Sequence, residues 1–425
     1  MKDLNRVFIT GRSALTASGA TADDTWKAVT SGHSGIEEIK QWDLHDWSHH
    51  LGGELKDFQP AKMLPDRKLI KVISRQDVMG INAAVQAVEH SNMLSYRDTL
   101  ECADAFNEQT AVYVGSPGNK YFQQYDFLPL LAKTNGDMQQ FAQQLFDEVH
   151  PTWLLRILPN NVLAYTGITY GFKGPNHNVT NHAVGGTQAL LEAFHAIRSG
   201  QADRAVVVAY DMGVDPQALF YYEQLGVLSE RHLKPFDRDH DGTILADGAA
   251  ALVLESEASV NARSARCYGE IVGGLSASEG AGLFSIDASG RPLTELLERT
   301  LVNTALSPQD IGLVVAHGNG NSKSDNSEAA VIKAVFAEHK VPVTAFKWSM
   351  GHTLCASGLI DAVMTTYALE HQCAPGIANL QYIEPACAGL AVSADPQSLH
   401  SSRYAIMINR GFASMNACLV IKACE

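Results

Sequence analysis

One pattern occurs twice along this chain and restricts the possible folds more than any other feature. In each copy a helical stretch, 78–90 or 293–304, precedes an apolar stretch that ends in a glycine-rich turn, 111–119 or 313–321. Each copy then continues with a strand-like stretch, a corner of small residues and a second helical stretch. Strands that alternate with helices at this spacing are typical of β/α units. The repeat therefore predicts an α/β fold with mostly parallel central strands and helical crossovers.

The repeat also divides the chain into two halves. No linker rich in Pro, Gly or Ser separates them, so we expect an N-terminal half over 1–255 and a C-terminal half over 256–425. Two such halves predict two stacked sheets covered by helices. Residues 119–160 have no counterpart in the second half, and we interpret them as an insertion. Its aromatic residues are Tyr121, Phe122, Tyr125, Phe127, Phe141, Phe146 and Trp153.

The bulk composition excludes several classes of protein. A hydrophobic fraction of 46% and a charged fraction of 18% over 425 residues are those of an ordinary soluble globular protein. The sequence has neither an apolar run of about 18 residues nor an apolar signal region, so we expect no membrane span and a cytoplasmic location. The formal net charge of −14 argues against nucleic acid as a partner. Seven scattered cysteines without CxxC spacing predict free thiols and no metal site.

The strand-to-helix corner at Ala183 has the sequence pattern expected around a catalytic nucleophile. The short β-branched stretch after Asn178 breaks at small residues, and the helical pattern 190–197 follows. A side chain at such a corner stands proud of the backbone at the positive end of a helix, where a thiolate would be stabilised. Alanine has no nucleophilic atom, so no covalent catalysis is expected at position 183.

Further candidate residues gather where apolar strands end. They are His317, Asn319 and Asn321 after the strand pattern 313–316, Lys347 and His352 before a second helical stretch, and Phe412 in a loop between two apolar strands. A lone histidine on an apolar strand is more often a satisfied core residue than a functional one. The residues alone therefore leave both interpretations of His317 and His352 open.

Taken together, these segments resemble the β-ketoacyl-acyl-carrier-protein synthases of the thiolase superfamily over nearly the whole chain. The matching motifs are the opening strand 7–11, Gly174-Pro175 nine residues before Ala183, Pro235-Phe236-Asp237, His317-Gly318 with Asp325 and Glu328, Lys347 with Gly351-His352, and Gly411-Phe412. Several motifs in the right order are a more specific signal than any one of them. The resemblance implies a five-layer αβαβα sandwich built from two pseudo-repeated halves.

Two departures from the family carry the functional argument. Active members have a cysteine where Ala183 stands, and that cysteine takes the acyl chain as a thioester. They usually have two threonines, which hold the phosphopantetheine arm, where this chain has Asn319 and Asn321. Asparagine is longer and offers both a donor and an acceptor, so we expect a changed geometry for the arm. Phe412 matches the family's gatekeeper position, and no cofactor or metal is expected.

The resemblance also favours a shared pocket for His317 and His352. We expect Lys347 and Glu328 to form a buried charge pair that holds two loops in register, because breaking such a pair costs about 3–5 kcal/mol. The backbone amides of Ala183 and Phe412 are expected to form an oxyanion hole.

Cys355 is expected to have a structural role. Cys355 is interpreted as a small buried residue at the repeat of the corner, not as a substitute nucleophile.

The leading hypothesis is a catalytically silent ketosynthase-like subunit, similar to the chain length factors of bacterial polyketide and aryl polyene systems. Such a subunit pairs with an active ketosynthase, meets the acyl carrier protein through that complex and shapes the tunnel for the growing chain. The insertion 119–160 would then set the product length.

Two alternatives stay open. One is a decarboxylase of malonyl carrier protein that uses His317 and His352 to stabilise the enolate. The other is a condensing enzyme whose cysteine at position 183 was replaced by alanine.

Overall fold

The computed structural model describes residues 4–44, 46–118, 127–337, 339–400 and 402–424. The strands of the main sheet are β1 Val7–Thr16, β4 Thr110–Gly115, β5 Asn176–Val179, β6 Arg204–Met212, β7 Asp247–Ser256, β8 Gly269–Ser278, β9 Ile311–Val315, β10 Val343–Thr344, β13 Tyr404–Gly411 and β14 Met415–Lys422. The short pairs are β2 Glu37–Glu38 with β3 Leu51–Gly52, and β11 Cys373–Ala374 with β12 Gln397–Ser398.

The helices alternate with these strands. They are α1 Ala22–Thr30, α2 Pro60–Met63, α3 Arg75–Ser91, α4 Met93–Arg97, α5 Asp104–Glu108, α6 Leu128–Lys133, α7 Met138–Glu148, α8 Trp153–Arg156, α9 Asn161–Tyr170, α10 Gly185–Arg198, α11 Pro216–Gln224, α12 Glu257–Arg263, α13 Arg291–Asn303, α14 Ser322–Val335, α15 Lys347–Met350 and α16 Ser357–Glu370. Short 3-10 turns precede two of them, His182–Val184 before α10 and Leu354–Ala356 before α16.

The order of the strands confirms the predicted internal repeat. The N-terminal half runs β1-β7-β6-β4-β5 and the C-terminal half runs β8-β14-β13-β9-β10. In both halves the first two neighbouring pairs are antiparallel and the last two are parallel. The two halves therefore have the same topology, although their sequences share only a weak pattern.

Two details of the predicted sheet need correction. The strands at the centre of the sheet, β7, β1, β8 and β14, pair antiparallel and not parallel. One reason is the tight turn between β13 and β14, because a short connection can only join antiparallel neighbours. The two halves also share one hydrogen-bonded sheet, since Val7–Ile9 of β1 pairs with 269–271 of β8.

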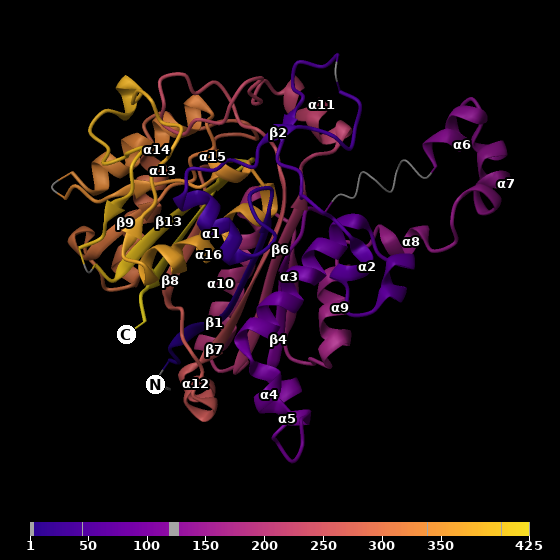
Figure 1. Ribbon diagram of the computed structural model, residues 1–425, viewed down its shortest axis with the longest axis horizontal. Coiled ribbons are helices and arrows are strands. Elements are labelled where there is room, and N and C mark those ends of the chain that lie inside the picture. The colour runs from indigo at the N-terminus through magenta and orange to yellow at the C-terminus, as the bar shows by residue number, and fades with distance from the viewer. Residues whose placement is uncertain (1–3, 45, 119–126, 338, 401, 425) are drawn as a thin grey trace.

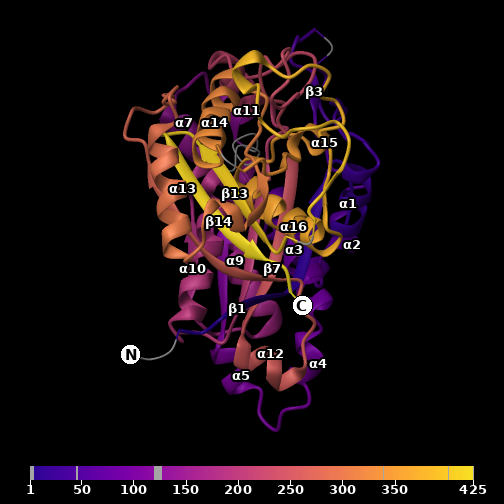
Figure 2. The same cartoon turned by 90° about the vertical axis from the view of Figure 1, so that its left-hand side faces the viewer.

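The helices form three layers around the two halves of the sheet. Helices α10 and α16 lie between the halves and pack against each other and against strands of both. Helices α3 and α9 cover the outer face of the N-terminal half, and α13 covers the outer face of the C-terminal half with α14 beside it. Figure 2 shows α13 on one side of β13 and β14 and α16 on the other. This is the thiolase-like sandwich that the family resemblance implies.

Helix α16 is buried on all sides, whereas α10 exposes Glu192 and His195 along one polar stripe and buries its other faces. From Ser357 to Leu369 every residue of α16 is buried, and α10 is buried at ten of its positions. A helix that is apolar all round is stable only when other elements surround it. These two helices therefore separate the two halves of the sheet.

The insertion contributes α6, α7 and α8, of which α6 and α7 stand off the body of the molecule whereas α8 lies against it (Figure 1). Phe127 packs edge-on against Phe141 and Trp153, whereas the Phe146 side chain is 83% exposed. The predicted aromatic residues Tyr121, Phe122 and Tyr125 lie outside the described residues. Among the parts of the chain that the structure describes, no helix is long and apolar enough to cross a membrane.

Candidate functional site

The site lies where the carboxyl ends of neighbouring strands meet. His317 follows β9, Arg410 is near the end of β13, and the corner at Ala183 follows β5. Ligands of α/β proteins usually bind at this end of the strands, where the loops diverge and leave a crevice. A cavity of about 280 Å³ opens there.

A strand-to-helix corner lies at Ala183, where the sequence pattern predicts one. His182 has a left-handed backbone with φ of 45°, and the 3-10 turn then leads straight into α10. A Cβ atom added to Gly186 would lie 2.6 Å from the carbonyl oxygen of Cys355, so glycine lets the two corners touch. Ala183 is fully buried and does not line the cavity, whereas His182 does.

His182 is a pocket-wall residue whose role the sequence leaves open. Its ring stacks on Phe412 with 4.4 Å between the centroids, and its Nε2 is hydrogen-bonded to the Tyr222 hydroxyl. The Phe412 amide donates to Nδ1 at 3.5 Å, so Nε2 carries the proton. Burial lowers the pKa of His182 to about 4, and the ring is neutral. The Phe412 amide, predicted to serve an oxyanion hole, is therefore directed at His182.

The imidazole of His317 is held at both its backbone and its ring. Its Nδ1 accepts from the Arg410 amide at 3.3 Å and faces the Asn409 side-chain nitrogen at 3.5 Å. Its own amide and that of Gly318 donate to the two Glu328 carboxylate oxygens at 2.7 and 3.0 Å. Burial lowers the pKa of His317 well below its usual range, so the neutral ring presents Nε2–H toward the cavity.

His352 is a second neutral donor beside the first. Its Nδ1 accepts from the Leu354 amide at 3.3 Å, and burial lowers the pKa of its ring well below the usual value. The rings of His317 and His352 are nearly perpendicular, with 5.2 Å between the centroids. Both line the cavity, as the resemblance predicts. Two neutral N–H groups that face the same cavity can stabilise an oxygen that gains negative charge.

The predicted ion pair between Lys347 and Glu328 is wrong. Lys347 Nζ lies 2.8 Å from the Asp361 carboxylate on α16, and both side chains are buried. Glu328 on α14 faces the turn after β9, where backbone amides and not an ammonium group are within reach. Burial raises the pKa of Glu328 to about 7. The apolar residues around Asp361 indicate a buried carboxylate, but they do not indicate that Lys347 is its partner.

Asn319 and Asn321 both line the cavity at its polar side. The Asn321 side-chain oxygen caps α14 by accepting from the amides of Lys323 and Ser324, and the Asn319 oxygen accepts from the Asn321 amide. Because both oxygens are engaged in local turns, the amide NH₂ groups are what these residues offer to a ligand. Threonine would offer a hydroxyl that both donates and accepts.

The structure adds cavity residues that the sequence did not reveal. Tyr222 and Phe284 complete an aromatic side with His182 and Phe412, and Glu279 and Arg410 form part of a polar side. Arg410 directly precedes the Gly411-Phe412 motif, so its position in the sequence could have indicated that it lies near the cavity. Glu279 follows β8 outside any motif and could not be found in this way.

The fold and the site together define a protein class. A thiolase-like sandwich with a nucleophile corner, two cavity histidines and a glycine-phenylalanine loop at the same strand ends is the architecture of ketosynthases. Residues 4–259 match the family described as beta-ketoacyl synthase, N-terminal domain, and residues 268–381 match its C-terminal domain. The chain belongs to the β-ketoacyl synthase family.

Known relatives and solved structures agree with this assignment. The chain is 28% identical over 397 residues to a 3-oxoacyl-[acyl-carrier-protein] synthase 2 of Synechocystis sp., which covers 90% of this chain and 89% of the relative. The fold of the present chain is similar to that of the ishigamide ketosynthase/chain length factor. The TM-score is 0.88 and the identity is 23%, over 99% of this chain and 100% of the other. A type II polyketide ketosynthase in complex with its acyl-carrier protein gives a TM-score of 0.86 and 21% identity, again over 99% and 100%.

Proposed function

We propose that this chain is a catalytically silent ketosynthase-like subunit, of the chain length factor type, which pairs with an active β-ketoacyl-acyl-carrier-protein synthase. The observation that carries the proposal is the methyl group of Ala183 at an otherwise intact nucleophile corner. His182 and Phe412 stack in the cavity beside that corner, so a carrier-bound acyl group would meet aromatic rings and not a thiol.

The surface of the insertion supports a role in association. Its exposed apolar side chains are Leu128, Met138, Phe146, Leu154, Leu155 and Leu158. Apolar side chains that gather on one projecting segment are typical of a protein contact. The described part of the insertion does not line this chain's own cavity. On this proposal it would influence product length by contacting the partner's tunnel.

The solved neighbours are consistent with this role. One of them is named as a ketosynthase/chain length factor and another as a ketosynthase bound to its acyl-carrier protein. By contrast, the curated relative from Synechocystis is named as a synthase. The alanine at position 183 is the reason to favour the silent role over the synthase role for this chain.

A second candidate function is decarboxylation of malonyl carrier protein, and the geometry of the two histidines favours it. In this reaction the bond to the terminal carboxylate breaks, CO₂ leaves, and its electron pair forms an enolate of the thioester. The Nε2–H groups of His317 and His352 would donate to the enolate oxygen, and a proton then converts the enolate to acetyl. This reaction needs no thiol at position 183.

The decisive experiment compares the chain alone with the chain coexpressed with a cysteine-bearing ketosynthase. Native mass analysis and an acyl-chain elongation assay are made on both samples. A one-to-one complex that elongates chains, with no elongation by this chain alone, supports the partner role. A stable homodimer that releases CO₂ from malonyl carrier protein, and loses this activity in the His317→Ala, His352→Ala double variant, supports the decarboxylase. Restoration of condensation by Ala183→Cys alone would instead indicate a condensing enzyme with a replaced cysteine.

A further inference from the structure

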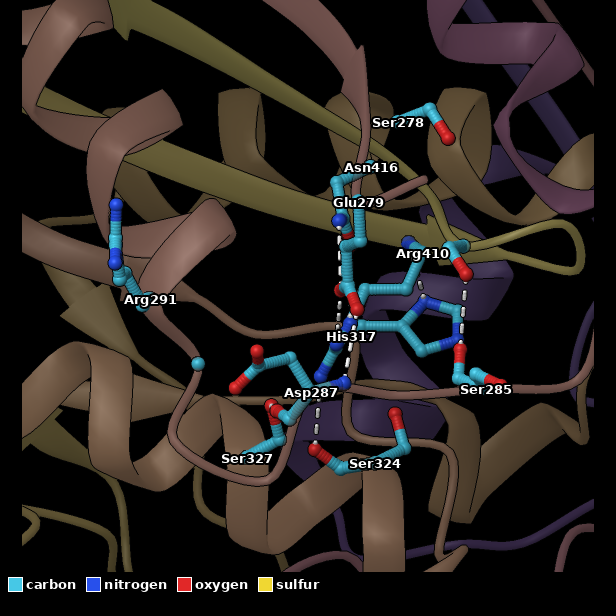
Figure 3. A network of polar contacts seen from close by, with 12 residues as sticks. Ser278, Glu279, Ser285, Asp287, Arg291, His317, Ser324, Ser327, Arg410 and Asn416 are labelled. Carbon is cyan, nitrogen blue, oxygen red and sulfur yellow. Dashed lines mark hydrogen bonds and ion pairs between the residues drawn. The ribbon is translucent and has the colours of Figure 1, made fainter. Parts of the chain in front are cut away.

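The Arg410 side chain is buried at the end of β13 and is clamped on three sides. Its Nη2 lies 2.9 Å from the Glu279 carboxylate, its Nε donates to the Asn416 side-chain oxygen at 3.1 Å, and its Nη1 donates to the Ser324 carbonyl at 3.1 Å. Only 5% of the guanidinium side chain and 2% of the carboxylate side chain are exposed. Figure 3 shows these contacts converging on Arg410.

The clamp joins four segments that are far apart in the sequence. Glu279 follows β8, Asn416 lies on β14, Ser324 is in the first turn of α14, and Arg410 is on β13. The Asn416 side-chain nitrogen also donates to Glu279 at 2.9 Å, so the three side chains form a closed polar network. The planar guanidinium has donors in fixed directions, and it can satisfy all these acceptors only in one orientation. The backbone of Arg410 is therefore held with its side chain.

That same backbone serves the cavity histidine. The Arg410 amide donates to His317 Nδ1 at 3.3 Å, and two residues later the Phe412 amide faces His182 Nδ1 at 3.5 Å. His317 Nδ1 must be unprotonated to accept this bond, which leaves the proton on Nε2. The position of the Arg410 amide thus determines which ring nitrogen of His317 faces the cavity as a donor.

We propose that Arg410 is a positioning residue for His317: its clamped guanidinium fixes the amide that selects the Nε2–H tautomer of the cavity histidine. Glu328 completes the arrangement from the other side, because its carboxylate accepts the His317 and Gly318 amides. The Arg410 charge favours the ionised form of Glu328 against the effect of burial, which raises the pKa of that carboxyl. Loss of Arg410 would therefore loosen His317 at both its ring and its backbone.

The test is nitrogen NMR of the histidine-labelled full chain, followed through a pH titration. In the unchanged protein, His317 should show one tautomer and no protonation in the accessible acidic range. In Arg410→Gln, His317 should populate both tautomers, and the tautomer ratio is the readout, because loss of the Arg410 charge would by itself raise the pKa of His317, which burial, Lys347, His352 and His182 also lower. His352 is the internal reference, because the Leu354 amide holds its Nδ1 independently of Arg410, and its signals should not move.

Two further variants keep the proposal open to refutation. Glu279→Gln removes the negative charge of the clamp but keeps its shape, and should populate the second tautomer of His317 to a smaller extent than Arg410→Gln does. Arg263→Gln breaks the buried contact of Arg263 with Glu255, which is another buried ion pair, and should lower stability without moving His317. If folded Arg410→Gln leaves His317 unchanged, or moves His352 equally, the positioning role is refuted. If Arg410→Gln does not fold, Glu279→Gln is the test: an unchanged tautomer of His317 in that variant refutes the positioning role.

Discussion

The two corners of the internal repeat have nearly the same backbone but different surroundings. His182 and Leu354 each begin a 3-10 turn in the left-handed region, with φ of 45° and 46°, and each turn leads into a helix of 14 residues. Leu354 packs into an apolar cluster with Val214 and Leu245, whereas His182 lines the cavity. A corner of this shape therefore has no fixed chemistry, because its neighbours decide whether it meets solvent or core.

The residues after these two positions strengthen the contrast. Cys355 has the thiol that Ala183 lacks, yet it is fully buried, and burial raises its pKa well above the usual value. Its amide donates to the buried Asp211, which faces it across the interface between the halves. A thiol in this environment is not a nucleophile. The chain thus has a thiol where no substrate can reach and a methyl group at the corner beside the cavity.

The largest expected effect concerns the ion pair beside the second corner. Lys347→Met leaves the buried Asp361 carboxylate without a partner, and we expect a loss of about 3–5 kcal/mol in the free energy of unfolding. The double variant Lys347→Met, Asp361→Leu removes both charges and should recover most of this loss. Urea denaturation of the two variants measures the difference. If the single and double variants were equally unstable, the unpaired Asp361 carboxylate would not be the cause of the lost stability.

Truncation of the two corner residues should separate their environments. Leu354→Ala should cost about 2–5 kcal/mol, because it empties a packed apolar cluster. His182→Ala should cost clearly less, since the space it leaves joins an existing cavity that water can enter. Thermal and urea denaturation provide the comparison. A His182→Ala variant as unstable as Leu354→Ala would mean that the aromatic stack is part of the core.

A buried carboxyl near the second corner should make stability depend on pH. Burial raises the pKa of Asp247 to about 7, above its ordinary value of 3.8, so the folded state binds the proton more tightly than the unfolded state. Its stabilising contribution is complete below the ordinary pKa and is lost as pH rises through about 7.

Asp247→Asn isolates this contribution. The Val214 amide donates to one Asp247 oxygen, and the other oxygen has no hydrogen-bond partner among the described residues, so the amide group should fit without losing a bond. Between mildly acidic and neutral pH, the free energy of unfolding should fall less steeply in the variant than in the unchanged protein. Urea denaturation at several pH values measures the slope. An unchanged slope would assign the pH dependence to other buried carboxyls, such as Glu328.

The smallest expected effect on stability, and the sharpest test of the first corner, is Ala183→Cys. In a Cys102→Ser background, which removes an exposed thiol, the new cysteine should resist iodoacetamide because position 183 is fully buried. The double variant Ala183→Cys, His182→Ala should react faster, and mass analysis of the folded protein records the rate. Rapid labelling of the single variant would show that His182 does not cover the corner.

Features encoded in local pattern could be predicted from the sequence. The repeated strand, corner and helix predict the two equivalent halves, and motif spacing places His317, His352 and Phe412 around one cavity. The antiparallel centre of the sheet was missed, because β7 and β14 follow their neighbours through connections whose direction the β/α repeat does not encode. Periodicity identifies a strand but does not identify its neighbour or its direction.

Pairings between side chains were harder to predict than positions. Lys347 and Glu328 stand in the expected motifs, but the motif spacing says nothing about which charge each one meets. Lys347 at the start of α15 meets Asp361 on α16, and Glu328 on α14 meets the backbone amides that follow β9, so both pairings join different elements. Arg410 was overlooked because its partners come from three other segments.

The sequence by itself determined the absence of a nucleophile at position 183 and the succession of strands and helices along the chain. Both depend on residue identity and short-range periodicity. Only the tertiary structure decided that Cys355 is inaccessible, that His182 lines the cavity, and that Arg410 supplies the amide for His317. These outcomes depend on contacts between residues far apart in the chain. Burial and hydrogen-bond geometry arise only when the two halves pack around α10 and α16.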